Sequence, residues 1–217
     1  MSSLPTGITD AIAILSRGSE GIDAVLGTMH GENRFSNALT ALQRLAESEG
    51  FPIAIVGGLG AIRYGYPAAT QNIDIAVSRE DLEKLVRCCS VYGFRVAWES
   101  KSGWHTLTFG DVEINVVPEG GKARDDSPTL IPGPRQMGVA IGLDYASLER
   151  WMELKISAFR QKDRAHVVEV LKKSDQSTVD FIEQHLHRVH ALYGSKFLDL
   201  CQQAITEREQ EKNHRRD

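Results

Sequence analysis

The fold of this chain is decided by residues 53–77, which read IAIVGGLGAIRYGYPAATQNIDIAV. The run opens with four apolar residues, 53–56, and such a run predicts a short buried strand. Gly57 and Gly58 follow at once. Glycine allows a sharp turn there and lets a phosphate approach backbone N–H groups at the start of a helix. A short helix is expected over residues 59–64, so the segment predicts a strand, a glycine turn and a helix in direct succession.

The same stretch ends in a second strand, residues 72–77, in which polar and apolar residues alternate. Because side chains alternate between the two faces of a strand, Asn72 and Asp74 share one face, with their β-carbons about 7 Å apart. A later expected strand carries Glu113 and Asn115 on its polar face. Polar groups beside a glycine turn suit a metal held next to a triphosphate. Each strand taken alone would be an ordinary half-buried strand with polar residues in solvent.

Two common phosphate-binding motifs do not fit the glycine turn. A dinucleotide-binding fingerprint that includes Gly58 and Gly60 would need a third glycine where Arg63 stands, and no strand–helix–strand alternation follows. A P-loop is excluded because the chain has no glycine–lysine pair followed by serine or threonine. A tight turn without a ligand stays open as the alternative.

The remainder of the chain predicts a mixed α+β protein. Ser78 and Asp81 form a capping box at the start of a helix that runs to about Tyr92 and stops at Gly93. Other helices are expected over 8–18, 35–49, 147–160, 163–173, 178–190 and 194–212. Other strands are expected over 94–98, 104–109 and 112–117, with a short one near 139–141. A surface loop is expected over 118–135, and the charged tail, 207–217, is expected to fray. The expected domains are an N-terminal helical lead (1–50), a small mixed-sheet core (51–145) and a C-terminal helical region (146–217).

Composition narrows the class of protein further. Of 217 residues, 41% are hydrophobic and 25% charged, which permits a buried core and argues against disorder. No apolar run approaches the roughly 18 residues of a membrane span, and the N-terminus lacks the basic region of a secretory signal. A net charge of −4 gives no sign of dominant non-specific nucleic-acid binding. Cys88, Cys89 and Cys201 form no disulfide framework or zinc motif, so we expect a cytoplasmic protein without a membrane partner.

The order of these features resembles the nucleotidyltransferase superfamily. In that superfamily a glycine–glycine or glycine–serine turn precedes a D-x-D strand, and a later strand carries a third aspartate. Downstream, residues 154–164, LKISAFRQKDR, are similar to the lysine-to-aspartate helical motif of the AbiEii-type branch, which includes toxin transferases and uncharacterised proteins. The resemblance covers about residues 53–173. It implies a nucleotidyltransferase-like core, a small mixed β-sheet with flanking helices, followed by the helical C-terminal half.

Members of this superfamily transfer a nucleoside monophosphate from a nucleoside triphosphate to a hydroxyl, using two divalent metal ions held by three carboxylates. The resemblance implies that Mg²⁺ or Mn²⁺ is the cofactor and that the acceptor is an unknown RNA, protein or small molecule; a protein partner is a further expectation. It assigns nucleotide binding to Gly57, Gly58, Arg63 and Thr70. It assigns catalytic positions to Asn72, Asp74, Asn115, Lys155 and Asp163, the first three of them also as metal ligands.

This sequence departs from the superfamily at the metal-binding positions. Two of the three carboxylates are replaced, by Asn72 and Asn115, and Mg²⁺ prefers charged oxygen ligands to a neutral amide carbonyl. Asp74 would hold one ion brought by the triphosphate, while a second ion loses its support. Each missing carboxylate removes several kcal/mol of transition-state stabilisation, and about 1.4 kcal/mol is tenfold in rate. Glu113 would substitute only if the site shifted by one pleat. His166 stands where the branch tends to have another aspartate.

We therefore expect a nucleotidyltransferase-family protein with weakened transfer. The rival interpretation is a non-catalytic module that binds a nucleotide or a partner protein, as in a toxin–antitoxin-like pair. A third is a structural domain whose glycine turn holds no ligand. Two further groups are expected to be structural. They are the histidines of the helix over 178–190, His185, His187 and His190, predicted on a solvated face, and Trp98 with Trp104, predicted to pack in the core or at its rim.

Overall fold

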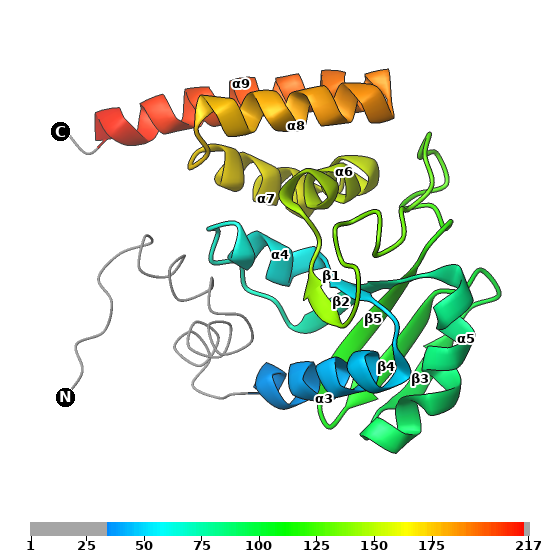
Figure 1. Cartoon of the computed structure of the whole chain (residues 1–217). Coiled ribbons are helices and arrows are strands. Elements are labelled where there is room, and N and C mark those ends of the chain that lie inside the picture. Colours follow the sequence, from blue (N-terminus) through cyan, green and yellow to red (C-terminus); the bar gives the residue numbers. More distant parts are fainter. Residues whose placement is uncertain (1–33, 215–217) are drawn as a thin grey trace, which may run out of the picture. The chain divides into compact units, whose positions relative to one another are not determined.

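The computed structural model describes residues 34–214, drawn in colour in Figure 1, and the helix expected over 8–18 lies outside them. The chain divides into two compact units. The first runs up to Gly121 and includes Pro132–Ala146, and the second combines Lys122–Ile131 with the chain from Ser147 onward. The first holds a mixed sheet with helices and the second is helical, which confirms the predicted α+β class.

A six-stranded sheet forms the first unit, with the strand order β3-β4-β5-β2-β1-β6. Its strands are β1 (Ile53–Ile55), β2 (Asn72–Val77), β3 (Arg95–Glu99), β4 (His105–Phe109), β5 (Val112–Pro118) and β6 (Leu143–Tyr145). β2 runs parallel to β5 and antiparallel to β1, so the sheet is mixed. The strand expected near 139–141 is wrong. Val139 instead closes a turn by donating its N–H to the carbonyl of Pro134 at 3.0 Å, and β6 pairs with β1 a few residues later.

Among the described residues of the first unit, three helices and one 3₁₀ turn accompany the sheet. They are α3 (Arg34–Glu49), α4 (Gly57–Arg63), α5 (Arg79–Cys88) and the 3₁₀ turn Cys89–Tyr92. α4 begins two residues earlier than expected, so both glycines of the turn belong to its first turn. Ser78 caps α5 as predicted, because its Oγ accepts the N–H of Asp81 at 3.0 Å. Gly93 ends this stretch in the left-handed conformation, with φ of 88°.

The central strands of the sheet have one apolar and one polar face. The apolar face belongs to the core, and its fully buried residues include Ile73, Ile75, Leu107, Ile114 and Val116. α3 packs against β5 and β6. The polar face carries Asn72 and Asp74 of β2. Their partners across the parallel ladder, Glu113 and Asn115, lie beside them because directly paired residues share a face.

An irregularity in β3 overturns the prediction that Trp98 packs in the core or at its rim. Val96 pairs with Leu107 of β4, but Trp98 pairs with Thr106, so Ala97 is left over as a bulge. An extra residue in one strand reverses the alternation that follows it. Trp98 is therefore turned away from the apolar face, and it is 55% exposed.

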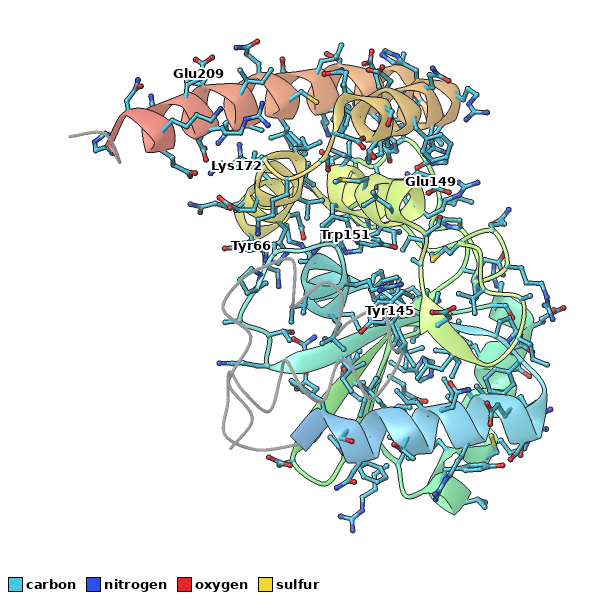
Figure 2. All side chains as sticks on the ribbon, turned by 60° about the vertical axis from the view of Figure 1, so that its left-hand side comes forward. Tyr66, Tyr145, Glu149, Trp151, Lys172 and Glu209 are labelled. Carbon is cyan, nitrogen blue, oxygen red and sulfur yellow. The ribbon has the colours of Figure 1, made fainter. Side chains whose placement is uncertain are left out.

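The second unit is a group of four helices, α6 (Leu148–Ala158), α7 (Gln161–Leu171), α8 (Gln176–Val189) and α9 (Ala191–His214). α6 contacts each of the other three, and its Trp151, labelled in Figure 2, is buried. The tail expected to fray from residue 207 is helical as far as His214. Lys172 explains this, because its ammonium lies 2.7 Å from Glu207 and 2.8 Å from Glu211 on the last turns of α9.

The prediction of a solvated histidine face on α8 is wrong for His185. Its Nε2 lies 2.8 Å from Oε2 of Glu153, and both side chains are buried. Arg150 lies 2.8 Å from the same carboxylate oxygen. The correction follows from the helical spacing, because His185 shares a face of α8 with the buried Ile182 and Leu186. Within the described part of the chain, no helix has both the length and the apolar character that crossing a membrane requires.

Candidate functional site

The polar face of the sheet brings three predicted site residues together. We call Asn72, Asp74 and Asn115 the amide–acid trio. Asp74 and Asn115 are directly paired in the β2–β5 ladder. Oδ1 of Asp74 accepts a hydrogen bond from Nδ2 of Asn72 at 2.6 Å and another from Nδ2 of Asn115 at 3.0 Å. The sequence-based expectation that these two separated strands place their polar side chains side by side is therefore met.

The hydrogen bonds fix the direction of both amides. An ionised carboxylate only accepts hydrogen bonds, so each asparagine must present its NH₂ group to Asp74. The carbonyl oxygen of Asn115 then faces away and accepts from the hydroxyl of Thr106 at 3.4 Å. Turning the amide of Asn115 over would break the bond to Asp74 and set its oxygen against the carboxylate. The trio is thus a self-satisfied cluster with one negative charge and two donors.

The diglycine turn lies directly against this cluster. Gly57 has φ of +64°, and a β-carbon built on it would fall 1.8 Å from Oδ2 of Asp74. A β-carbon on Gly58 would fall 2.8 Å from Oγ1 of Thr70, whose hydroxyl donates to the carbonyl of Asn72 at 3.0 Å. Both glycines are therefore required by close packing against β2 and the residues that lead into it. This packing fills the Cα side of the turn, whereas a bound phosphate would approach backbone N–H groups.

Arg63, at the end of α4, lies over an aromatic ring of the same unit. Its guanidinium carbon is 5.7 Å from the ring centre of Tyr145, which is labelled in Figure 2. Tyr145 pairs with Ile55, two residues before Gly57. Burial raises the pKa of the Tyr145 hydroxyl far above its usual value, and the nearby positive charge of Arg63 opposes this only in part. The phenol therefore stays neutral at physiological pH, and the guanidinium is the charged member of this pair.

The amide–acid trio does not fit a two-metal centre. Such a centre needs several oxygen ligands, most of them charged, directed at each ion. Here one carboxylate is present, its Oδ1 already accepts two N–H groups, and its Oδ2 abuts the backbone of Gly57. A further carboxylate on this face, Glu113, pairs with Asn72 in the ladder and is exposed. In this arrangement the amides supply hydrogen-bond donors where metal ions would need acceptors.

The lysine-to-aspartate motif lies in the second unit as a buried ion pair. Nζ of Lys155 is 2.9 Å from Oδ1 of Asp163, and the two side chains are 7% and 4% exposed. Oδ2 of Asp163 accepts the N–H of Arg160, which caps the first turn of α7. Phe159, between the two helices, adopts φ of 46°. The ion pair therefore links α6 to α7 across a tight turn. The catalytic roles expected for Lys155 and Asp163 stay predictions.

His166, one turn further along α7, is kept neutral by its surroundings. Burial lowers its pKa to about 4, and the positive charges of Lys155 and Lys162 act in the same direction. Asp163 opposes them only in part. The residue that stands where the AbiEii-type branch tends to have an aspartate therefore carries no charge at neutral pH.

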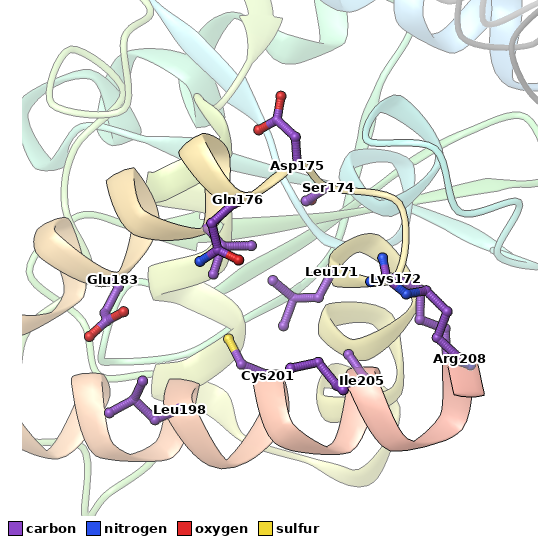
Figure 3. A pocket seen from close by; sticks show the side chains of 12 residues that line it. Leu171, Lys172, Ser174, Asp175, Gln176, Glu183, Leu198, Cys201, Ile205 and Arg208 are labelled. Carbon is purple, nitrogen blue, oxygen red and sulfur yellow. The ribbon is translucent and has the colours of Figure 1, made fainter. Parts of the chain in front are cut away.

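A second candidate site is a cavity of about 430 Å³ in the second unit, shown in Figure 3. Residues of α8 and α9 line it, with Leu171 of α7 as a further wall. Its one thiol, Cys201, is a poor nucleophile because burial and the charge of Glu183 raise its pKa to about 11. At one end lies Lys172, whose ammonium contacts three glutamates. Burial alone would lower the pKa of Lys172, but these carboxylates outweigh it and raise it. Neither the thiol nor the ammonium of this cavity is therefore a ready nucleophile.

Thr106 is a member of the site that was not predicted from the sequence. The signal was present, because the tight turn at Gly110 and Asp111 fixes the register of the β4–β5 hairpin and so pairs Thr106 with Asn115. Counting back from the turn would have placed this hydroxyl next to the trio.

Comparisons with known proteins give fold-level likenesses. No protein-family model matches the sequence, and no curated protein matches it. The solution structure of the antibiotic-resistance factor ANT(2″)-Ia is 17% identical and has a TM-score of 0.42, covering 84% of this chain and 98% of that one. The crystal structure of ANT(2″)-Ia with adenylyl-2″-tobramycin is 16% identical, with a TM-score of 0.38 and coverage of 80% and 98%.

A third similar structure is the CCA-adding enzyme of Thermotoga maritima in complex with tRNA. It is 14% identical and has a TM-score of 0.36, and the match covers 82% of this chain and 51% of the enzyme. All three TM-scores lie below 0.5, so these overlaps decide nothing about the activity of this chain. The chemistry of this chain depends on its own site residues.

Replacing Gly57 by alanine tests the contact between the glycine turn and Asp74. The added methyl group would collide with the carboxylate, and alanine disfavours positive φ, so we expect Gly57→Ala to lower the unfolding free energy by about 3 kcal/mol. Gly50→Ala is the control, because Gly50 has φ of +74° and open space around it. The unfolding free energy of Gly50→Ala should fall by about 1 kcal/mol. Urea unfolding measures both, and equal losses would show that Asp74 does not constrain the turn.

The lowered pKa of His166 predicts a stability that falls in mild acid. The usual pKa of histidine is 6.5, so at lower pH this side chain takes up a proton in the unfolded chain. In the folded chain it stays neutral until about pH 4. Between pH 6.5 and pH 4 the unfolding free energy of wild type should therefore fall by about 1 kcal/mol, a figure reduced because the ring is partly exposed. His166→Gln should lack this share of the loss. Melting temperatures from pH 7 to pH 4 compare the two proteins, and parallel curves would contradict a neutral buried His166.

Proposed function

We propose that this chain is a nucleotidyltransferase-superfamily protein of the AbiEii type that binds a nucleoside triphosphate and transfers its nucleoside monophosphate only weakly. One observation carries the proposal: the polar residues of β2 and β5 meet in a single cluster against the diglycine turn. An ordinary half-buried sheet gives no reason for three polar side chains and two close-packed glycines to converge. The order of turn, first strand and later strand in the sequence supports the same assignment.

Nucleotide binding would rest on groups of the first unit that surround the cluster. The turn at Gly57 and Gly58 offers backbone to the phosphates, and Thr70 lies against it. Arg63 supplies a positive charge on the same short helix. These positions are the nucleotide-binding residues that the superfamily resemblance implies. The positive charge of Arg63 favours an anionic ligand near the turn, and Asp74, the carboxylate that the described residues place against the turn, already accepts two N–H groups.

Weak transfer follows from the composition of the amide–acid trio. Divalent ions would supply charge stabilisation to the transferred phosphoryl group in related chemistry, and this trio does not hold two of them. Asp74 is left to orient groups through Oδ1, which is shared with Asn72 and Asn115. The loss of each charged ligand removes several kcal/mol of stabilisation, which corresponds to a rate reduction of roughly a hundredfold or more.

A non-catalytic nucleotide-binding module is the second candidate. The observation that favours it is the hydrogen bonding of the trio, because both amides saturate the same carboxylate oxygen and leave no arrangement ready for ions. The two candidates predict the same binding and differ only in whether any product forms.

Transfer is measured with α-labelled nucleoside triphosphates, Mg²⁺ or Mn²⁺, and either total RNA or cell extract. We expect little labelled product from wild type and at least about tenfold more from Asn72→Asp/Asn115→Asp, because each exchange restores a charged ligand. Asp74→Asn in that background should abolish the gain. The matched control is Asn37→Asp/Asn213→Asp, which adds the same charge at exposed positions of α3 and α9. Absence of both product and a nucleotide-dependent rise in melting temperature would overturn the proposal.

Metal binding is tested separately through stability. In a metal chelator, Asn72→Asp/Asn115→Asp should be about 3 kcal/mol less stable than wild type, because two donors to Asp74 are replaced by two like charges. Mg²⁺ or Mn²⁺ should restore most of this loss in the variant and change wild type little. Thermal or urea unfolding with and without the ions gives the answer. The same response in both proteins would refute the view that the two asparagines occupy metal-ligand positions.

A further inference from the structure

A row of exposed apolar side chains runs along the cavity of the second unit that Figure 3 shows. On α9 the row holds Leu198 and Ile205, which are 45% and 47% exposed. They are seven positions apart, so on a helix they point in nearly the same direction. Val179 of α8 lines the same cavity. We call this surface, with Glu183 and Arg208 at its ends, the α8–α9 groove.

The two ends of the α8–α9 groove carry opposite charges. A β-carbon on Gly194 would fall 2.3 Å from Cε1 of His187, so α8 and α9 pack as an antiparallel hairpin. Glu183 is one turn before His187, which places it beside Leu198, one turn after Gly194. Arg208 lines the other end, as Figure 3 shows, and it is exposed.

The other charged groups of the groove are already engaged. Lys172 contacts three glutamates. Asp175 accepts the N–H of Thr178 at 2.8 Å, and in Figure 3 its carboxylate points away from α9. Between the two ends, the thiol of Cys201 is uncharged at neutral pH, because burial and the charge of Glu183 raise its pKa to about 11. The groove therefore presents a negative end, an uncharged middle and a positive end to a partner.

A second copy of the chain is the partner that this charge pattern fits. When two α9 helices lie antiparallel about a two-fold axis midway between Leu198 and Ile205, Leu198 of each copy faces the partner's Ile205. Glu183, level with Leu198, then lies within about three residues, or about 4.5 Å along the helix, of the partner's Arg208. Each of these contacts occurs twice in a two-fold interface. A parallel arrangement would instead set like charges beside each other at both ends.

We propose that the α8–α9 groove is the interface of a two-fold symmetric homodimer in which the α9 helices pair in antiparallel orientation. The groove belongs to the second unit and holds none of the residues assigned to nucleotide or metal binding, so the inference goes beyond the proposed function and does not depend on it. From Leu198 to Arg208 the seam is about 15 Å long. So short a seam makes a small interface, and we expect a dissociation constant on the order of 10 µM.

Sedimentation velocity of the full chain, from about 1 to about 100 µM at low salt, measures the association. Glu183→Arg and Arg208→Glu should each weaken it about tenfold, because each places like charges together at both ends of the seam. An equimolar mixture of the two variants should return to within about threefold of wild type, since each variant then meets the opposite charge on its partner. A change that only disturbed folding would not be rescued by mixing.

Leu198→Gln tests the apolar part of the seam and should weaken association about tenfold. Phe181→Gln is the matched control. It removes an apolar side chain of α8 that is 52% exposed and does not line the groove, and it should leave association unchanged. Melting temperatures show that each variant folds.

A wild type that stays monomeric at about 100 µM overturns the inference, as does a mixture of the charge variants that fails to associate. Species larger than a dimer would contradict a closed two-fold interface. The rise in melting temperature with nucleoside triphosphate reads the proposed function separately, and Leu198→Gln should leave it intact. A monomeric protein that still responds to the triphosphate would sink the dimer alone, and a dimer without that response would sink the proposed function alone.

Discussion

One carboxylate organises the polar side of the first unit. Asp74 accepts hydrogen bonds from side chains of its own strand and of β5, and its second oxygen sets the closest approach of the turn at Gly57. Hydrogen bonds to an ionised group are about twice as strong as neutral ones. The turn and both strands are therefore tied to a single charged group. A substitution at any of these positions alters the surroundings of the others.

Local features of the fold follow from the sequence, and long-range ones do not. The cap at Ser78 and the helix stop at Gly93 depend on neighbours along the chain, and both are found as predicted. The strand near 139–141 and the exposure of Trp98 were misjudged because they depend on partners. Val139 is held by a turn at Pro134, and Trp98 is aimed by a bulge that no periodicity reveals. The apolar residues at 139–141 suggested strand pairing, and the indole of Trp98 suggested burial. In both cases contacts with neighbouring segments produced a different result.

In the candidate site, too, the local features were predicted from the sequence and the long-range contacts were not. Alternation along each strand predicted which side chains share a face, and the β2–β5 ladder brings them together. The direction of the amides could not be predicted, because it depends on which acceptors Asn72 and Asn115 meet in space. Lys155 and Asp163 show the limit of a motif: their spacing was recognised, and the structure adds that they form a buried clasp between α6 and α7. A buried ion pair of this kind adds little net stability, because the desolvation of both charges offsets much of their attraction.

The parallel pairing of β2 with β5 has a consequence for how the chain reaches its native state. Asp74 and Asn115 are 41 positions apart, and α5 with the β3–β4 hairpin lies between them. Closing so long a loop costs conformational entropy before any contact repays it, whereas the hairpin of β4 and β5 closes locally. We therefore expect the cluster around Asp74 to form late in folding. Nascent or partly unfolded chains would expose the edge of β5 before β2 arrives to cover it.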